Sequence, residues 1–313
     1  AIIQEEVELP KLAVAVVDEQ HRFGVAQRAS MRVKGMRPHL LAMSATPIPR
    51  SLALTAYGDL DISVIDEMPP GRQPIRTRWV ASDRRNAAYG FVREQVESEN
   101  QVFIVCPLIE ESEVIQARAA TEEYERLSRD IFPDFTLGLL HGRMPLRQKE
   151  EVMDQFKRGE LDILVSTSVV EVGIDVPNAT VMLIDGADRF GLAQLHQFRG
   201  RVGRGRHQGY CLLISDSPGE EARERLKTLE RGQDGFELAE HDLRIRGPGD
   251  YLGTRQSGFL PDFKVAKITD HDILNLARRE AISILDADPM LEMPENRLLA
   301  RRVARFVSDH PDE

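Results

Sequence analysis

Two adjacent carboxylates, Asp18 and Glu19, open a tetrapeptide that ends with Gln20 and His21 and directly follows an apolar run, Leu12 to Val17. The run has the composition of a buried strand, which would place both carboxylates at its C-terminal tip. There, one carboxylate can hold Mg²⁺ and the other can orient or deprotonate an attacking water, as nucleoside-triphosphate hydrolysis requires. Four residues of this kind are weak evidence unless a partner exists elsewhere in the chain.

An arginine-rich stretch from Gln197 to Arg206 supplies that partner. Its arginines, at positions 199, 201, 204 and 206, have no acidic residue among them, and glycines at 200, 203 and 205 let the backbone approach a ligand closely. The planar guanidinium fork suits phosphate oxygens, and an arginine that reaches a γ-phosphate contributes roughly 10³-fold or more to phosphoryl transfer. The alternative is a solvated basic helix end, but repeated Gly-Arg is not a composition that helices adopt for solubility.

Ser44 and Thr46 follow a second apolar run, His39 to Met43, and stand just before Pro47. Small hydroxyl side chains at a strand tip can hydrogen-bond a neighbouring carboxylate or contact phosphate. The alternative is a Ser/Thr turn before proline. Their position soon after the acidic tetrapeptide favours the functional interpretation.

Two later strand ends also carry groups that suit phosphate. The run Asp162 to Ser166 is followed by Thr167 to Asp175, whose hydroxyl and backbone N–H groups could meet a phosphate of nucleotide or nucleic acid. Within it, Gly173 and Asp175 could meet the ribose and the arginine array. His141 also follows a strand and precedes a helix start, a natural phosphate position, although a lone histidine there is more often structural.

Composition narrows the possible functions. The chain has 313 residues, 42% hydrophobic, and a formal net charge of −10, so nucleic-acid contacts must come from local basic stretches. Cys106 and Cys211 lie far apart in apolar runs, which indicates buried free thiols, and no spacing suggests zinc. No run is long enough to span a membrane. The chain opens at Ala1 without methionine and in mid-pattern, and it is expected to be part of a longer protein.

Alternating apolar runs and helical stretches predict an α/β fold with parallel sheets flanked by helices. The expected strands are Leu12–Val17, His39–Met43, Gln101–Cys106, Thr136–Leu140, Asp162–Ser166, Thr180–Ile184 and Gly209–Ile214. Several are too uniformly apolar to alternate, as expected for strands covered on both faces. The expected helices are Asp83–Glu99, Pro145–Arg158, Ala193–Val202, Pro218–Arg231, Asp270–Ala287 and Glu295–Val307.

A segment rich in proline, Asp66 to Pro74, reads as a linker. Two strands precede it and five follow it, which predicts one partial and one complete α/β domain. We therefore expect four parts: a partial lobe with linker at 1–75, a complete lobe at 76–216, a hairpin and loop at 217–262, and C-terminal helices at 263–313.

Taken in order, the motifs DEQH, SAT, TSVVEVGID and QFRGRVGR resemble motifs II, III, V and VI of superfamily-two helicases. The stretch Asp242 to Gly258 is similar to the translocation motif shared by RecG and the transcription-repair coupling factor. Within that pair, its RGPGDYLGTRQSG and the linker MPPGRQPI are closer to the RecG family. The resemblance implies RecA-like lobes, with ATP bound in the cleft between them.

The resemblance also assigns roles to single residues. Asp18 would coordinate Mg²⁺, and Glu19 would activate water. Arg201 and Arg204 would be arginine fingers that Gln197 orients. The remaining roles are coupling of the ATP site by Gln20, His21, Ser44 and Thr46, DNA-backbone contacts by His141, Ser166 and Thr167, and coupling to translocation by Arg225, Arg246 and Gln256.

The function that this resemblance implies is ATP-dependent translocation on duplex DNA, with remodelling of stalled forks and Holliday junctions. The whole protein would be a cytoplasmic, nucleoid-associated bacterial enzyme that acts as a monomer. The sequence contains no Gly-Lys dipeptide, so the phosphate-binding loop is missing and the isolated chain is expected to be inactive. The alternatives are the equivalent part of a transcription-repair coupling factor and a non-hydrolysing nucleic-acid or protein scaffold. Intact Glu19, Arg201 and Arg204 argue against the scaffold.

Overall fold

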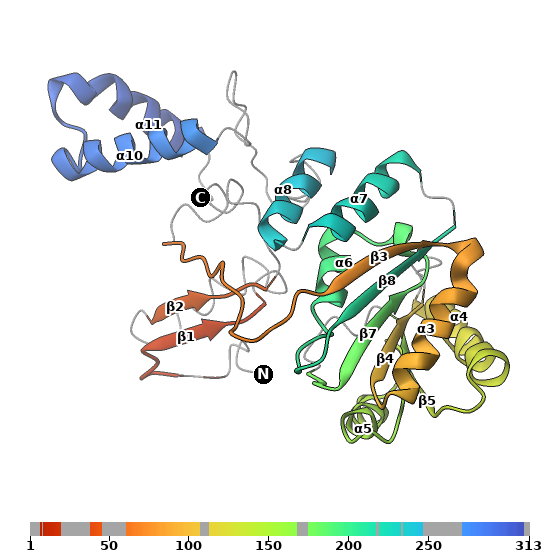
Figure 1. Ribbon diagram of the computed structural model, residues 1–313. Helices are drawn as coiled ribbons and strands as arrows, with labels where there is room; N and C mark the ends of the chain where they lie inside the picture. The colour runs from red at the N-terminus through yellow and green to blue at the C-terminus, as the bar shows by residue number, and fades with distance from the viewer. Residues whose placement is uncertain are drawn as a thin grey trace. The chain divides into compact units, whose positions relative to one another are not determined.

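The chain forms two β-sheets and a set of helices (Figure 1). The computed structural model describes residues 7, 9–19, 38–45, 61–106, 113–167, 175–216, 219–232, 234–246 and 271–309. These residues fall into two compact units, the first holding both sheets and the second holding the C-terminal helices.

The smaller sheet contains two parallel strands, β1 (Val14–Val17) and β2 (His39–Ala42). Val17 pairs with Ala42, so the two strands end in register. Ala15 and Val17 are buried, whereas Val14 and Val16 are more than half exposed. Both strands were predicted, and in β1 the buried and exposed side chains alternate.

The larger sheet contains six strands, all parallel, in the order β3-β8-β7-β4-β6-β5. Their bounds are β3 (Arg76–Ala81), β4 (Gln101–Val105), β5 (Leu137–Leu140), β6 (Ile163–Ser166), β7 (Ala179–Ile184) and β8 (Tyr210–Ser215). The predicted parallel sheet is confirmed, with one strand more than the five expected. Strand β3 was missed because Arg76 and Arg78 interrupt its apolar pattern, which an edge strand beside β8 tolerates.

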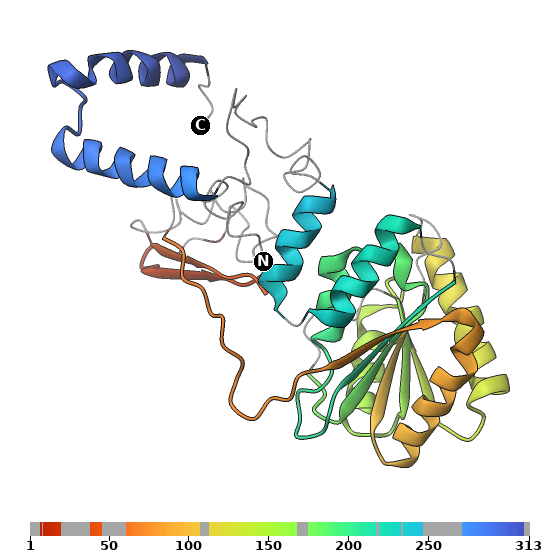
Figure 2. The same ribbon diagram turned by 45° about the horizontal axis from the view of Figure 1, so that its top comes forward.

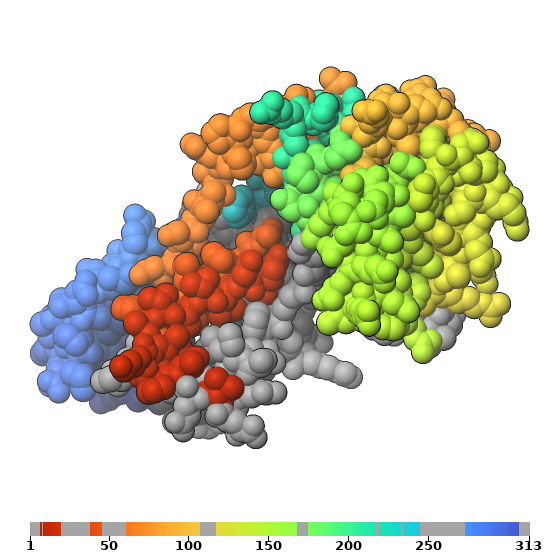
Figure 3. All heavy atoms as spheres, turned by 90° about the horizontal axis from the view of Figure 1, so that it is seen from below, coloured from red at the N-terminus to blue at the C-terminus, as the bar shows by residue number. Residues whose placement is uncertain are grey.

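Helices cover both faces of this sheet, as Figures 1 and 2 show. On one face lie α3 (Arg85–Glu97) and α4 (Glu113–Arg126), and on the other lie α5 (Leu146–Lys157), α6 (Leu192–Arg199) and α7 (Glu220–Arg231). Strand β4 serves both cores, because Val102 and Ile104 pack under α3 and α4 while Phe103 and Val105 pack on the opposite face. This explains why its sequence is apolar from Val102 to Val105. In the space-filling view, the segments coloured yellow to green form one closely packed body (Figure 3).

Two helices were not predicted. One is α4, which continues into a π-helical turn, Leu127–Ile131. The other is α8 (Gly235–Arg246), which follows α7 after a short break and packs against both α6 and α7. Its many charged residues hide the apolar positions Leu238, Ala239 and Leu243, which are buried. Together, α7 and α8 form a helical hairpin at one end of the first unit.

The second unit contains α10 (His271–Ala287) and α11 (Arg297–Asp309), both predicted from their amphipathic patterns. The turn between them is organised by the carboxylate of Asp288, which accepts hydrogen bonds from the backbone N–H groups of Glu292 and Met293 and from the side chain of Asn296, each at 2.9 Å. These bonds lower the pKa of Asp288. Among the described residues, no helix is long and apolar enough to cross a membrane.

Candidate functional site

The acidic motif lies at the carboxyl end of β1. Asp18 is exposed and Glu19 is half-buried, and the backbone N–H of Glu19 donates to Oδ1 of Asp18 at 2.8 Å. Glu19 has a φ of 52°, in the left-handed region that costs a residue with a side chain on the order of 1 kcal/mol. Strained backbone of this kind is concentrated at functional sites. A carboxylate oxygen is the hard ligand that Mg²⁺ prefers, so the exposed Asp18 fits the predicted metal role.

Ser44 reaches the same edge of the small sheet. The backbone N–H of Met43 donates to the carbonyl of Val17 at 2.7 Å, so the chain leaves β2 beside the point where it leaves β1. The acidic motif and the predicted hydroxyl motif therefore meet at one edge. Gln20, His21 and Thr46 lie outside the described residues.

The arginine-rich stretch begins on α6 and continues as a loop. Gln197 is half-buried on the helix, and the backbone N–H of Arg201 closes a turn onto Phe198. Arg204 donates from Nε to the carbonyl of Gly200 at 3.1 Å, and its Nη1 lies 3.5 Å from Oδ1 of Asp175. The structure thus brings Arg204 and Asp175 together, as the sequence suggested. Gly173 lies outside the described residues.

Two glycines shape this loop. Gly203 has a φ of +66°, which a side chain would strain. At Gly205, an added Cβ would lie 2.5 Å from the carbonyl oxygen of Pro177, so the backbone approach to the neighbouring segment requires glycine. The loop that carries Arg204 is therefore held in one conformation by close backbone packing.

Arg199 has a different position from the other arginines. Its side chain is 4% exposed, and Nη1 donates to the carbonyls of Leu229 at 2.9 Å and Gly232 at 2.7 Å. Burial lowers the pKa of Arg199. These carbonyls lie at the C-terminal end of α7, where a positive charge is favoured. Arg199 therefore joins α6 to the α7–α8 hairpin by hydrogen bonds. The interpretation of all four arginines as one array that reaches phosphate is too broad, because the Arg199 side chain is hydrogen-bonded to the end of α7.

A second arginine also fastens α7 to the large sheet's loops. Arg225 donates from Nη2 to the carbonyl of Asp188 at 3.1 Å and from Nη1 to Glu221 at 2.6 Å. Asp188 belongs to a 3₁₀ turn, Ala187–Arg189, that precedes α6. The predicted contact of Arg225 with Gln256 cannot be followed, because Gln256 and the side chain of Arg246 lie outside the described part of the chain.

The predicted DNA-contacting residues meet at the carboxyl edge of the large sheet. Leu140 pairs with Ser166, and the backbone N–H of Thr167 donates to the carbonyl of Leu140 at 3.2 Å. His141 follows β5 directly, while Ser166 ends β6. The Nδ1 atom of His141 and the Oγ atom of Ser166 are buried and have no hydrogen-bond partner among the described residues. Buried polar atoms without a partner call for an explanation, and a ligand bound at this edge is one.

Positive charge surrounds His141. Burial lowers its pKa, and the nearby charges of Lys149 and Arg143 lower it further. The Nζ of Lys149 donates to the carbonyl of Gly142 in the turn that leads into α5. A neutral imidazole flanked by two cations fits contact with an anionic backbone.

Comparison with known proteins places this geometry in a family. A model described as "Helicase conserved C-terminal domain" matches residues 85–206, and one described as "ATP-dependent DNA helicase RecG, domain 3, C-terminal" matches residues 232–309. ATP-dependent DNA helicase RecG of Synechocystis sp. is 54% identical over 293 residues, covering 93% of this chain and 35% of that protein. The chain belongs to the RecG family. It is also 53% identical to RecG of Thermotoga maritima, covering 94% of this chain and 38% of the relative.

Solved structures agree with this assignment. The structure titled "Structure of RecG bound to three-way DNA junction" matches with a TM-score of 0.67 and 48% identity, over 88% of this chain and 35% of that one. A match to yeast Dbp5 bound to RNA, at 14% identity and a TM-score of 0.53, shows the RecA-like helicase fold alone. This RecG-family chain spans 35% to 38% of the length of the two curated relatives named above.

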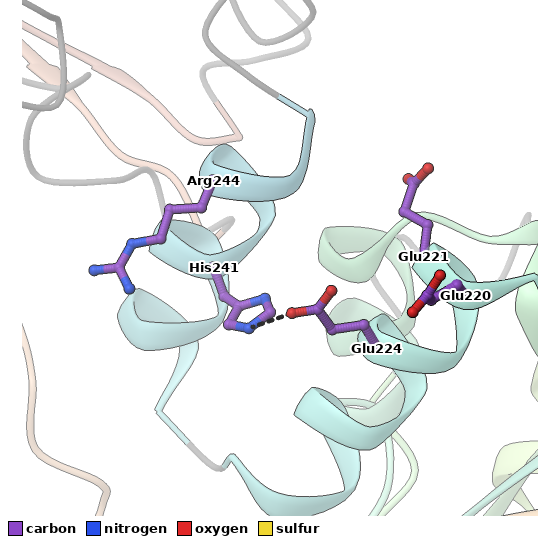
Figure 4. A pocket seen from close by; sticks show the side chains of 5 residues that line it. All are labelled: Glu220, Glu221, Glu224, His241 and Arg244. Carbon is purple, nitrogen blue, oxygen red and sulfur yellow. Dashed lines mark ion pairs between the residues drawn. The ribbon is translucent and has the colours of Figure 1, made fainter.

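The two family models lie on either side of a segment that contains the first helix of the hairpin. The helicase model ends at residue 206 and the RecG model begins at residue 232, so β8 and α7 lie between them. Figure 4 shows the open pocket between α7 and α8, lined by Glu220, Glu221, Glu224, His241 and Arg244. Nε2 of His241 lies 3.5 Å from Oε1 of Glu224, whereas Arg244 extends away from the glutamates. In this RecG-family chain, the pocket thus marks where the two helices of the hairpin contact each other.

Sequence reasoning missed one residue at the arginine loop. Arg72 in the linker donates from Nη2 to the carbonyl of Gly200 at 3.3 Å, the same oxygen that Arg204 contacts. Nothing in the proline-rich linker indicated a contact between Arg72 and the arginine loop. The one available sign was that Arg72 belongs to the run MPPGRQPI, which resembles the RecG family. Helix α6, which carries Arg199, was predicted. The inward orientation of the Arg199 side chain was not, because it depends on α7, which is distant in the sequence.

Proposed function

We propose that this RecG-family chain is part of an ATP-dependent motor that moves on duplex DNA and remodels branched DNA, such as stalled forks and Holliday junctions. The observation that carries the proposal is that two arginines of α6 and the loop after it make different contacts. Arg199 contacts the α7–α8 hairpin, and five residues later Arg204, in the glycine-shaped loop, lies 3.5 Å from Asp175. One short segment therefore joins the arginine loop, which would face the nucleotide, to the hairpin that would couple nucleotide binding to movement on DNA.

At the ATP site, Asp18 would hold Mg²⁺, which supplies charge neutralisation of the phosphates when bound. Glu19 would accept a proton from the attacking water. Arg201 and Arg204 would stabilise the charge that develops on the transferred phosphoryl group, with Gln197 orienting them. The remaining nucleotide-coupling residues in this proposal are Gln20, His21, Ser44, Thr46, Gly173 and Asp175.

On the DNA side, His141, Ser166 and Thr167 would contact the phosphate backbone at the carboxyl edge of the large sheet. The unpartnered Nδ1 of His141 and Oγ of Ser166, together with the adjacent Lys149, support this role. Arg225, Arg246 and Gln256 would transmit movement of the lobe to the loop that acts on duplex DNA. In the proposal, residues 1–75 belong to one lobe, 76–216 form the second, 217–262 the translocation element and 263–313 the C-terminal helices. The whole protein would act as a monomer.

The test uses the full-length gene product that contains this chain. Glu19→Gln should lower DNA-stimulated ATP hydrolysis at least about 10²-fold while ATP binding persists, because the general base is lost and the shape is kept. ATP hydrolysis is measured with a synthetic three-way junction, and junction unwinding is followed by gel. Glu160→Gln, on the exposed surface, is the matched control. A non-hydrolysing scaffold would show no ATP turnover in the unaltered protein, which would contradict the proposal.

A further inference from the structure

The linker residue Arg72 belongs to the same charged cluster as Arg204 and Asp175. Nη2 of Arg72 and Nε of Arg204 both donate to the carbonyl of Gly200, at 3.3 and 3.1 Å. Asp175 contacts Arg204 at 3.5 Å and is two-thirds exposed, with a side-chain exposure of 67%. Two guanidinium groups thus converge on one carbonyl oxygen, and the carboxylate of Asp175 that pairs with Arg204 is largely solvated.

The electrostatics of the cluster favour an added anion. Burial lowers the pKa of Arg72, the charge of Arg204 lowers it further, and Asp175 opposes both effects. The Nε atom of Arg72 is buried and has no hydrogen-bond partner among the described residues. A buried charged donor without a partner is unfavourable, so a ligand oxygen at this point would relieve both the repulsion between the two arginines and the missing hydrogen bond.

The linker is held firmly where Arg72 projects. A turn from Pro69 to Arg72 is closed by a 3.2 Å backbone hydrogen bond, and Gly71 supplies the positive φ of 82° that this turn needs. Gln73 donates to the carbonyl of Arg206 at 3.4 Å. Gln208 in turn donates to the carbonyl of Pro74 at 2.6 Å, so linker and arginine loop are joined on both sides. Arg72 is therefore presented to the loop in a fixed register.

We propose that Arg72 binds the terminal phosphate of the nucleotide together with Arg204, an assignment that rests on the proposed ATP-dependent function. The pair forms a receptor with two guanidinium forks, one from the linker and one from the loop after α6. Planar forks suit the oxygens of a terminal phosphate, which carries more charge than the inner phosphates. The linker would therefore distinguish ATP from ADP directly.

The test compares nucleotide affinities in the full-length gene product. AMP-PNP and ADP compete separately against a fluorescent ADP analogue, so the two affinities are measured on one scale. Arg72→Gln should weaken AMP-PNP binding about tenfold or more and ADP binding less than about twofold. Arg72→Lys should retain part of the AMP-PNP affinity, because it keeps the charge and loses the fork. Equal weakening of both nucleotides, or no weakening, would overturn the assignment.

Gln73→Ala is the matched control, because it removes the neighbouring linker–loop hydrogen bond without removing a charge. It should leave the AMP-PNP to ADP preference unchanged. If it reproduces the effect of Arg72→Gln, Arg72 only ties the linker down and the inference fails. Thermal unfolding of each variant shows that the fold is retained, and a loss of fold in Arg72→Gln leaves Arg72→Lys to decide. Absence of nucleotide binding and hydrolysis in the unaltered protein would instead contradict the proposed function itself.

Discussion

Nη1 of Arg199 lies 2.9 Å from the carbonyl oxygen of Leu229, and this hydrogen bond joins the helix of the arginine motif to the end of α7. The same nitrogen donates to Gly232 at 2.7 Å. The two carbonyls belong to the last turn of α7 and the residue beyond it, which have no partner within the helix. The hairpin is thus attached to α6 by a buried charge.

Replacing Arg199 with methionine should destabilise the fold by about 2–3 kcal/mol, because two carbonyls lose a charged donor. Methionine has a similar length, so little packing is lost. Urea unfolding of the 313-residue chain measures the change. Arg206→Met, at an exposed position in the same loop, is the control and should change stability by less than about 0.5 kcal/mol. Equal effects of the two substitutions would show that the bonds to α7 contribute nothing.

Gly205→Ala should destabilise the arginine loop, because the new Cβ would lie 2.5 Å from the carbonyl oxygen of Pro177. We expect a loss of about 1–3 kcal/mol in the free energy of unfolding, since backbone must shift to admit the methyl group.

Gly90→Ala is the opposite case, because Gly90 lies within α3 and its added Cβ meets nothing within 4 Å. It should stabilise the chain by about 0.5–1 kcal/mol. Both changes are read from urea unfolding, and a neutral Gly205→Ala would refute the close packing.

The isolated 313-residue chain should show no DNA-stimulated ATP hydrolysis, because it contains no Gly-Lys dipeptide and hence no phosphate-binding lysine loop. A phosphate-release assay with and without a three-way junction measures this. The full-length gene product serves as the positive control. Turnover by the isolated chain at the rate of that control would mean that another residue holds the β- and γ-phosphates.

The parallel sheets and most helices were predicted from sequence, because β4 from Val102 to Val105 and β7 from Val181 to Ile184 are continuous apolar runs. Such runs are expected in a sheet covered on both faces. Strand β3 was not predicted, because the exposed Arg76 and Arg78 interrupt its apolar pattern. Helix α8 was hidden because its buried positions, Leu238 and Leu243, are separated by charged residues. The local hydrophobic pattern does not predict an element that lies at the edge of a sheet or that packs mainly on other helices.

The candidate site was predictable in part. Asp175 and Arg204 were expected to meet, and they lie 3.5 Å apart. Arg72 could not be placed from sequence, because its approach to Gly200 depends on hydrogen bonds between residues more than 100 positions apart. The orientation of Arg199 depends in the same way on carbonyls of α7. Motifs reveal which residues are chemically able to act, whereas tertiary contacts decide which of them face the ligand.

Stability of the chain should fall in mild acid because of His196 on α6. Burial lowers its pKa to about 4 from an ordinary value of 6.5, the charge of Arg199 lowers it further, and Asp234 opposes the shift. Between these two pH values the unfolded chain binds a proton that the folded chain excludes. The contribution of neutral His196 is therefore complete above about pH 6.5 and is lost progressively as the pH falls towards 4.

At pH 5 the loss amounts to roughly 2 kcal/mol relative to pH 7.5, from the difference between the two pKa values. Urea unfolding at both pH values gives the drop for the unaltered chain, which also contains contributions from carboxylates. His196→Gln, which carries no titrating group, should show a drop smaller by that amount, and His207→Gln, at an exposed position, should not. If His196→Gln and the unaltered chain lose stability equally between pH 7.5 and 5, the imidazole of His196 accepts a proton in the folded state, and its burial against Arg199 does not keep it neutral.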